Sequence, residues 1–123
     1  ILHSEPSREF GDRHLGAERR AAEFEAIVDG LLALKDSRVV VLTNGLLLRR
    51  YDAALGRWPG DRFHLQISID GMRYSHERIR GPRSFERLES QLRWLRSKGV
   101  PFTLSMCVMG ANRAEMPDVV DFA

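Results

Sequence analysis

The stretch FHLQISIDGMRYSHERIRG, residues 63–81, decides how the rest of the chain is arranged. It opens as a β-strand, in which successive side chains point to opposite faces of a sheet. The apolar side chains on one face are Leu65, Ile67 and Ile69. The polar side chains on the other face are His64, Gln66, Ser68 and Asp70. A strand of this kind suits a sheet that helices cover on one face while a ligand meets the other.

The strand ends in a turn that leads into a basic segment. Gly71 follows Asp70 and permits the positive φ of a sharp turn. The next residues are expected to form a loop rich in arginine, which closes with Arg80 before Gly81. Polar groups at the carboxyl end of a strand, beside a basic loop, are typical of the ligand-binding edge of an α/β protein. The end of this strand is therefore the candidate binding edge.

Strand-like and helix-like segments alternate along the whole chain. The expected strands are residues 1–3, 38–43, 63–69 and 102–109. The expected helices are residues 17–35, 46–56, 84–98 and 113–123, and a loop is expected over residues 7–16. Successive strand–helix units require parallel strands and right-handed crossovers, so the sequence predicts an α/β fold of about four parallel βα units. Half of an eight-stranded barrel, most of a six-stranded barrel and a doubly wound open sheet all fit this order.

Two of the expected helices begin with residues that favour capping. Ser84 is a good N-cap for the helix over residues 84–98, because its hydroxyl can accept from an unpaired backbone N–H. Asn112 and Glu115 have the spacing of a capping pattern for the last helix. Both starts are therefore expected to be stabilised locally.

The composition indicates one globular domain without a membrane span. Hydrophobic residues make up 43% of the 123 residues and charged residues 29%, as in soluble domains. No apolar run approaches the roughly 20 residues of a membrane helix. The net charge is only +2 and the arginines are scattered, so no nucleic-acid partner is expected. The single cysteine, Cys107, excludes an internal disulfide, is expected to be buried, and favours a reducing, cytoplasmic compartment.

Both ends of the sequence look cut. The chain starts with Ile1 rather than methionine and stops inside what reads as an amphipathic helix. Residues 1–123 are therefore expected to be an internal fragment of a larger protein. An unclosed parallel sheet exposes two edge strands, so the isolated fragment is expected to self-associate or to accept a partner's strand.

The motifs of the central stretch resemble a known family. Ser68-Ile69-Asp70-Gly71 is followed by His76, by Ile79-Arg80-Gly81 and by Ser84-Phe85-Glu86. This succession resembles the middle of the radical S-adenosylmethionine (SAM) enzymes, most closely the peptide-modifying branch that carries extra iron–sulfur clusters in a C-terminal, SPASM-type extension. Thr43-Asn44-Gly45 resembles the Thr-Asn-Gly that ends the third strand of these enzymes, and His3-Ser4-Glu5-Pro6 stands where they carry Gly-Gly-Glu-Pro.

The resemblance implies a fold, a cofactor and a set of contacts. It implies that the chain is part of a radical SAM (β/α)6 partial TIM barrel. The residues that it places around SAM are Ser4, Glu5, Asn44, Ser68, Asp70 and Arg80. Among these, Ser68 and Arg80 are expected to hold the SAM carboxylate. Gln66 is expected to face the substrate or SAM, and His76 is expected to have a structural hydrogen-bonding role rather than that of a general base.

The resemblance also implies a reaction. In the family a [4Fe-4S] cluster cleaves SAM reductively, and the 5′-deoxyadenosyl radical abstracts hydrogen from a substrate, here expected to be a peptide. Three cysteines in a Cys-x-x-x-Cys-x-x-Cys pattern hold that cluster, and this chain has one cysteine, so the fragment alone is expected to be inactive. The main alternative is a degenerate or partial barrel that acts as a non-enzymatic interaction module. A phosphate- or sugar-binding barrel enzyme is a third, although no glycine-rich phosphate loop is present.

Overall fold

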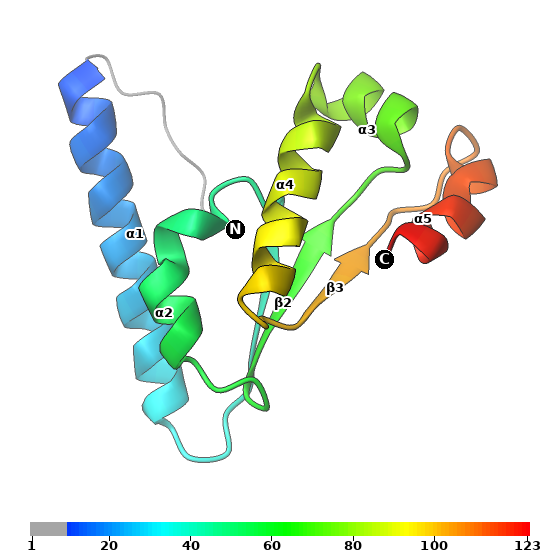
Figure 1. Ribbon diagram of the computed structural model, residues 1–123. Coiled ribbons are helices and arrows are strands. Elements are labelled where there is room, and N and C mark those ends of the chain that lie inside the picture. The colour runs from blue at the N-terminus through cyan, green and yellow to red at the C-terminus, as the bar shows by residue number, and fades with distance from the viewer. Residues whose placement is uncertain (1–9) are drawn as a thin grey trace.

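The computed structural model describes residues 10–123, and its elements follow one another as the sequence predicts, helix after strand (Figure 1). The strands are β1 (Val39–Thr43), β2 (Phe63–Ser68) and β3 (Phe102–Ser105). The helices are α1 (Phe10–Ala33), α2 (Asp52–Arg57), α3 (Arg73–Arg80), α4 (Ser84–Ser97) and α5 (Met116–Phe122), with short 3₁₀ helices η1 (Leu48–Tyr51) and η2 (Arg113–Glu115). The expected strand over residues 1–3 lies outside the described residues. Within residues 10–123, no helix is long and apolar enough to cross a membrane.

The three strands form a parallel sheet in the order β1-β2-β3, so the predicted parallel α/β architecture is confirmed. Val39 lies opposite Phe63, and Leu65 lies opposite Phe102. Strand β3 is shorter than the predicted span of 102–109. It ends at Ser105 because its partner β2 ends opposite it, so the following residues have no neighbouring strand to pair with.

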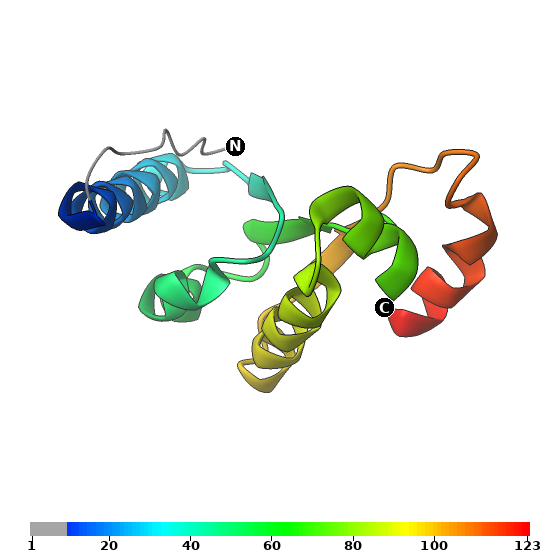
Figure 2. The same cartoon turned by 90° about the horizontal axis from the view of Figure 1, so that it is seen from above.

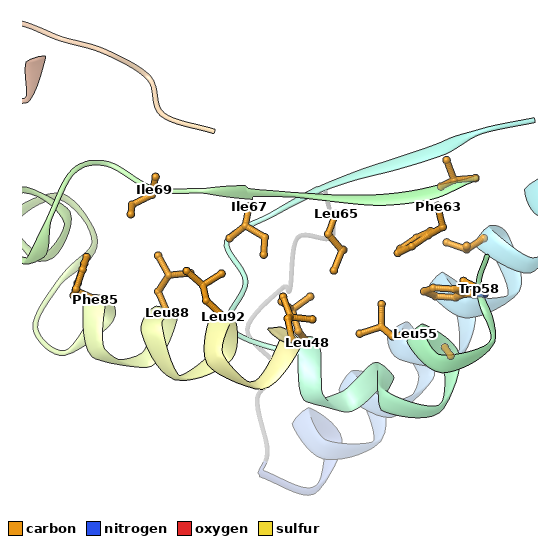
Figure 3. Packing of buried hydrophobic residues seen from close by; sticks show 14 of the residues in the cluster. Leu48, Leu55, Trp58, Phe63, Leu65, Ile67, Ile69, Phe85, Leu88 and Leu92 are labelled. Carbon is orange, nitrogen blue, oxygen red and sulfur yellow. The ribbon is translucent and has the colours of Figure 1, made fainter. Parts of the chain in front are cut away.

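Helices cover one face of the sheet, as the alternation in residues 63–69 predicts. Phe63, Leu65 and Ile67 are buried, and the residues between them are only half-buried. Helix α4 and the η1–α2 segment lie together beneath this apolar face (Figure 3). Their side chains that complete the core are Leu48, Leu55, Phe85, Leu88, Leu92 and Leu95. Each such leucine stabilises the fold by roughly 1.5–3 kcal/mol when it is fully buried.

Helix α1 packs against η1 and the residue that follows α2 through an aromatic cluster. The Phe24 ring meets the Tyr51 ring edge-on at 5.1 Å and the Trp58 ring at 6.1 Å. Trp58 in turn lies 4.6 Å from the ring of Phe63 on β2, and its Nε1–H donates to Asp29 at 2.8 Å. Viewed from above, α1 lies on the β1 side of the molecule and α5 on the opposite side (Figure 2).

Helix α1 is longer than predicted at its start. It begins at Phe10, whereas a loop was expected over residues 7–16. Glycine costs a helix only about 1 kcal/mol relative to alanine, and the glycines of this segment do not stop it. At its other end, the Arg62 guanidinium donates to the carbonyls of Leu32 at 2.8 Å and Leu34 at 2.7 Å, which a helix C-terminus leaves without intrahelical partners.

Three further local expectations differ from the structure. The segment expected to be an arginine-rich loop contains helix α3, which has no apolar stripe of its own and is fixed by polar contacts at the strand end. Ser84 is the first residue of α4 and donates to the carbonyl of Gly81 at 2.7 Å, so it is not the predicted N-cap. Cys107 is exposed rather than buried, because the chain has left the sheet before it.

Candidate functional site

The candidate site lies at the edge of the sheet where the three parallel strands end. Thr43, the last residue of β1, lies opposite Ile67, so Asn44 follows at the level of Ser68. Ser68 in turn lies opposite Ser105 on β3. The fold therefore brings Asn44 and Ser68 to the same edge, as expected for strand-end residues. The predicted contacts Ser4 and Glu5 lie outside the described residues.

Asp70 is held at this edge by side chains from other elements. Its backbone N–H donates to Nδ1 of His76 at 3.1 Å, and its carbonyl accepts from Nδ2 of Asn112 at 3.2 Å. Its carboxylate accepts from Nε of Arg80 and forms an ion pair with it. Asp70 is buried, so these contacts fix both the backbone and the charge of the residue that ends the central strand.

Arg80 reaches back from the end of α3 to the strand end. Arg80 was predicted to lie at the same strand end as Asp70, and the structure places the two side chains in contact although they are ten residues apart in the sequence. Only Nε is used by Asp70, and no other described residue accepts from the guanidinium. The side chain is 33% exposed. The two terminal nitrogens can therefore donate to a ligand in the planar, two-pronged geometry that suits a carboxylate.

His76 has the structural role that the sequence predicts. It is 2% exposed and lies edge-on to Phe85, with 6.0 Å between the ring centroids. Because Nδ1 accepts from the N–H of Asp70, the proton of the neutral ring is assigned to Nε2. Burial lowers the pKa of His76, and the nearby Arg80 cation lowers it further against the opposing charges of Asp70 and Glu77. At neutral pH the imidazole is uncharged, and its Nδ1 accepts from the backbone of Asp70.

Glu115 is a site residue that the sequence reasoning missed. It was expected to cap its own helix, but no side-chain cap is present there. Instead its Oε1 accepts from the N–H of Met72 at 3.0 Å, and its Oε2 accepts from the Ser75 hydroxyl. Gly71 has φ +131°, and a Cβ on it would stand 3.0 Å from Oε2 of Glu115. Glycine is thus needed for the carboxylate to reach the start of α3.

Asn112 also acts at a distance rather than as the expected cap. Its Oδ1 accepts from the N–H of Met109 at 2.7 Å, and its amide donates to the carbonyls of Cys107 and Asp70. The side chain is fully buried. Asn112 therefore joins the loop after β3 to the end of β2. No local pattern could have shown this, since the contact with Asp70 spans 42 residues.

The remaining predicted residues present free polar groups. Asn44 is exposed, and its Oδ1 accepts from the N–H of Leu46 at 3.0 Å, which leaves its amide hydrogens for a ligand. Ser68 is half-buried, and its hydroxyl has no hydrogen-bond partner among the described residues. Gln66 is half-buried on the uncovered face, one row below Ser68. On the same face, Nε2 of His64 lies 3.0 Å from Oγ1 of Thr103.

These donors suit a small ligand with a carboxylate rather than a metal cluster. Among the predicted contacts that the structure describes, the groups left for a ligand are the guanidinium of Arg80, the hydroxyl of Ser68 and the amide of Asn44. Among residues 10–123, no three His, Cys, Asp or Glu side chains are grouped to hold a metal ion, and the whole chain has one cysteine. The residues of this chain therefore do not fit the [4Fe-4S] cluster, which needs cysteine ligands.

Comparison of the chain with protein-family models, with curated proteins and with solved structures found no match. The chemistry of the strand-end site therefore has to be inferred from its own residues and from the motif that they form. That motif places one hydroxyl, one ion pair and one turn glycine at the carboxyl end of the central strand. These are the groups on which a functional proposal rests.

Proposed function

We propose that this chain is part of a radical SAM enzyme and that its strand-end site binds the methionine carboxylate of SAM. The observation that carries the proposal is the position of Arg80, whose guanidinium lies at the strand end with no partner on its terminal nitrogens among residues 10–123. The Ser-x-Asp-Gly motif and the parallel sheet support it. With it we infer the finer fold, part of a (β/α)6 barrel, because the strands follow one another across the sheet in sequence order.

Each residue has a distinct part in this binding. The terminal nitrogens of Arg80 and the hydroxyl of Ser68 donate to the carboxylate, and the charge on Arg80 strengthens the contact. Asp70 orients the guanidinium by accepting from Nε. Asn44 and Gln66 offer neutral hydrogen bonds beside it. Cleavage of SAM requires a cluster for which this chain lacks the cysteines, so the proposal for residues 1–123 concerns binding alone.

The test is the affinity for SAM, measured by isothermal titration calorimetry. Arg80→Ala removes a charge-assisted bidentate contact, which is worth roughly 1.5–3 kcal/mol and corresponds to a rise of about ten- to hundredfold in Kd. Arg80→Lys should restore part of the affinity, because an ammonium is a point donor. Arg78→Ala, two residues away on the same helix, is the control and should bind SAM as the wild type does.

The competing interpretation is a non-enzymatic interaction module. It is favoured by the exposure of Val40 and Leu42, two apolar side chains of β1 on the uncovered face of the sheet. The two interpretations give opposite results in the same titration. Circular dichroism should show that the wild-type chain and Arg80→Ala have the same fold. If the folded wild-type chain then binds no SAM, the cofactor site is rejected and the interaction module is the interpretation that stands.

A further inference from the structure

The excess positive charge of the chain is concentrated on helices α3 and α4. Residues 73–98 hold eight of the 19 basic residues and three of the 17 acidic ones, although the net charge of the whole chain is only +2. The two helices follow one another across a short turn and pack together, so their charges share one part of the molecule (Figure 1). A positive surface of this kind attracts negatively charged partners.

Most basic side chains of this span already have a partner within the described residues. Those paired with a carboxylate are Arg73, Arg80, Arg93 and Lys98. Arg96 donates to the carbonyl of Ala123. Three exposed side chains, which we call the turn arginines, have no ion pair or hydrogen bond to residues 10–123; they are Arg78, Arg83 and Arg87. They surround the turn that joins α3 to α4, so three unpaired guanidinium groups are gathered there.

Arg83 has a backbone conformation that arginine seldom adopts. Its φ of 65° and ψ of 1° lie in the left-handed region, directly before the first residue of α4. Glycine adopts this conformation without steric cost, whereas a Cβ is strained there. Folding alone would be better served by glycine, so the arginine side chain serves another purpose at this turn. The N–H of Arg87 donates to the carbonyl of Arg83 at 3.0 Å, and residues at this spacing share one helix face.

An exposed aromatic side chain lies near these charges. Tyr74 is 75% exposed, the highest fraction among the large hydrophobic side chains that the structure describes. It precedes Arg78 by one turn of α3, so the two share the outer face of the helix, while Ser75 and His76 are buried on another face. Tyrosine and arginine are enriched among the residues that contribute most to binding at protein interfaces. The outer face of α3 therefore has the composition of an interaction surface.

We propose that Tyr74 and the turn arginines bind an acidic peptide segment, with carboxylates on the guanidinium groups and an apolar side chain on the tyrosine ring. Arginine donates in a planar, two-pronged geometry that matches a carboxylate. Nucleic acid suits the surface less well, because Glu77 and Glu86 stand among the arginines and repel a backbone of continuous negative charge. In a completed barrel the helices form the outer layer, so closure of the sheet leaves this surface open.

The test is fluorescence anisotropy with a labelled peptide of repeating Glu-Glu-Leu. The wild-type chain should bind this peptide, and the affinity should fall as the salt concentration rises. Arg83→Gly should raise the Kd about two- to fivefold, as expected for one exposed ion pair. It should unfold at the same temperature as the wild type or at a higher one, because glycine relieves the backbone at this position. A loss of binding therefore cannot be attributed to a loss of the fold.

The triple variant Arg78→Ala, Arg83→Gly and Arg87→Ala should raise the Kd for the peptide by about tenfold or more. Arg38→Ala is the matched control, because Arg38 is exposed and precedes β1 at the opposite end of the sheet. It should bind the peptide as the wild type does. A neutral peptide of repeating Gln-Gln-Leu should not bind, and single-stranded DNA of the same charge should bind more weakly than the acidic peptide.

Three results would overturn the proposal. They are a wild-type chain that does not bind the acidic peptide, an equal loss of affinity in Arg38→Ala and in the triple variant, and DNA that binds more tightly than the peptide. The proposal is independent of SAM binding. The triple variant keeps Ser68 and Arg80 and should bind SAM as the wild type does, so failure of one proposal leaves the other intact.

Discussion

At the scale of the residue, His76 shows how a polar side chain can be structural inside a site. It is buried, neutral and hydrogen-bonded to the backbone of Asp70, so it holds the strand end instead of transferring protons. The sequence alone predicted this role, because the residue stands among charged neighbours in a motif whose chemistry uses other groups. The sequence could not predict the partner of His76, because the partner is a backbone N–H, a group that every residue except proline carries.

His76 makes stability depend on pH in a defined direction. Its pKa is lowered in the folded state, mainly by burial, while the unfolded chain has the ordinary value of about 6.5. The unfolded state therefore takes up a proton first as the pH falls. The contribution of His76 to the free energy of unfolding should be fully present above that value. It should decrease as the pH drops below that value toward the pKa of the folded state.

Urea titrations across this pH range would measure the effect. His76→Gln keeps a hydrogen-bond acceptor without a titrating group, so the part of the pH dependence between neutral pH and the folded pKa should disappear. His64→Gln is the control, because His64 is on the uncovered face and leaves the buried ring intact. Equal slopes in the wild type and in His76→Gln would contradict the assignment.

At the scale of the element, the helices and strands that could be predicted are those whose apolar residues recur at the spacing of a strand or of a helix. Strand β2 alternates between core and open face, and α4 carries Phe85, Leu88, Leu92 and Leu95 along one stripe, so both were predicted nearly to the residue. Helix α3 was missed because its buried residues are Ser75 and His76, which a period of apolar residues cannot reveal. Its contacts are tertiary.

The candidate site divides in the same way. Ser68, Asp70 and Arg80 were identified because they stand in one short motif, and the fold brings the last two together. Asn112 and Glu115 were assigned to local caps, because both residue types favour helix starts. Their partners lie 42 and 43 residues away, a distance over which one sequence carries no pairing signal.

Helix α3 depends on Glu115, and this dependence can be measured. Glu115→Ala removes both accepting oxygens, which leaves the Met72 N–H and the Ser75 hydroxyl without their acceptor. A buried donor without a partner costs about 1–3 kcal/mol. The unfolding free energy in urea should fall by that amount, and the amides of α3 should exchange faster.

Glu86→Ala provides the comparison for this change. Glu86 is an exposed carboxylate on α4, so the same substitution there should alter stability by less than about 0.5 kcal/mol. Should both variants unfold alike, the contact of Glu115 with the start of α3 would contribute nothing to stability, and α3 would be held by its other contacts, those of His76 and Arg80 with Asp70 and of Arg73 with Phe85.

At the scale of the whole molecule, α1 is joined to the rest of the chain by an aromatic cluster, beside the buried Val28 and the contacts of Asp29. Phe24 contributes the only ring that α1 places against Tyr51 and Trp58 among the described side chains. Phe24→Ala should lower the unfolding free energy by up to about 3 kcal/mol, toward the low end for such a change because the side chain is half-buried. Exchange should accelerate along α1 before it does in β2.

Glu23→Ala is the neighbouring control, at an exposed position of the same helix. It should change neither the stability nor the order in which α1 and β2 exchange. If α1 and β2 exchanged together in Phe24→Ala, the two would unfold as one unit. The aromatic cluster would then not be the contact whose loss lets α1 unfold separately from the sheet.

The links from Asn112 and Glu115 to the end of β2 have a consequence for how the protein is made. A ribosome that has released residues up to the end of β3 has supplied the three described strands of the sheet. The carbonyl of Asp70 then still lacks its donor, the amide of Asn112, and the N–H of Met72 still lacks its acceptor, the carboxylate of Glu115. The sheet can therefore form early during translation, whereas the candidate binding edge becomes rigid only after Asn112 and Glu115 have emerged.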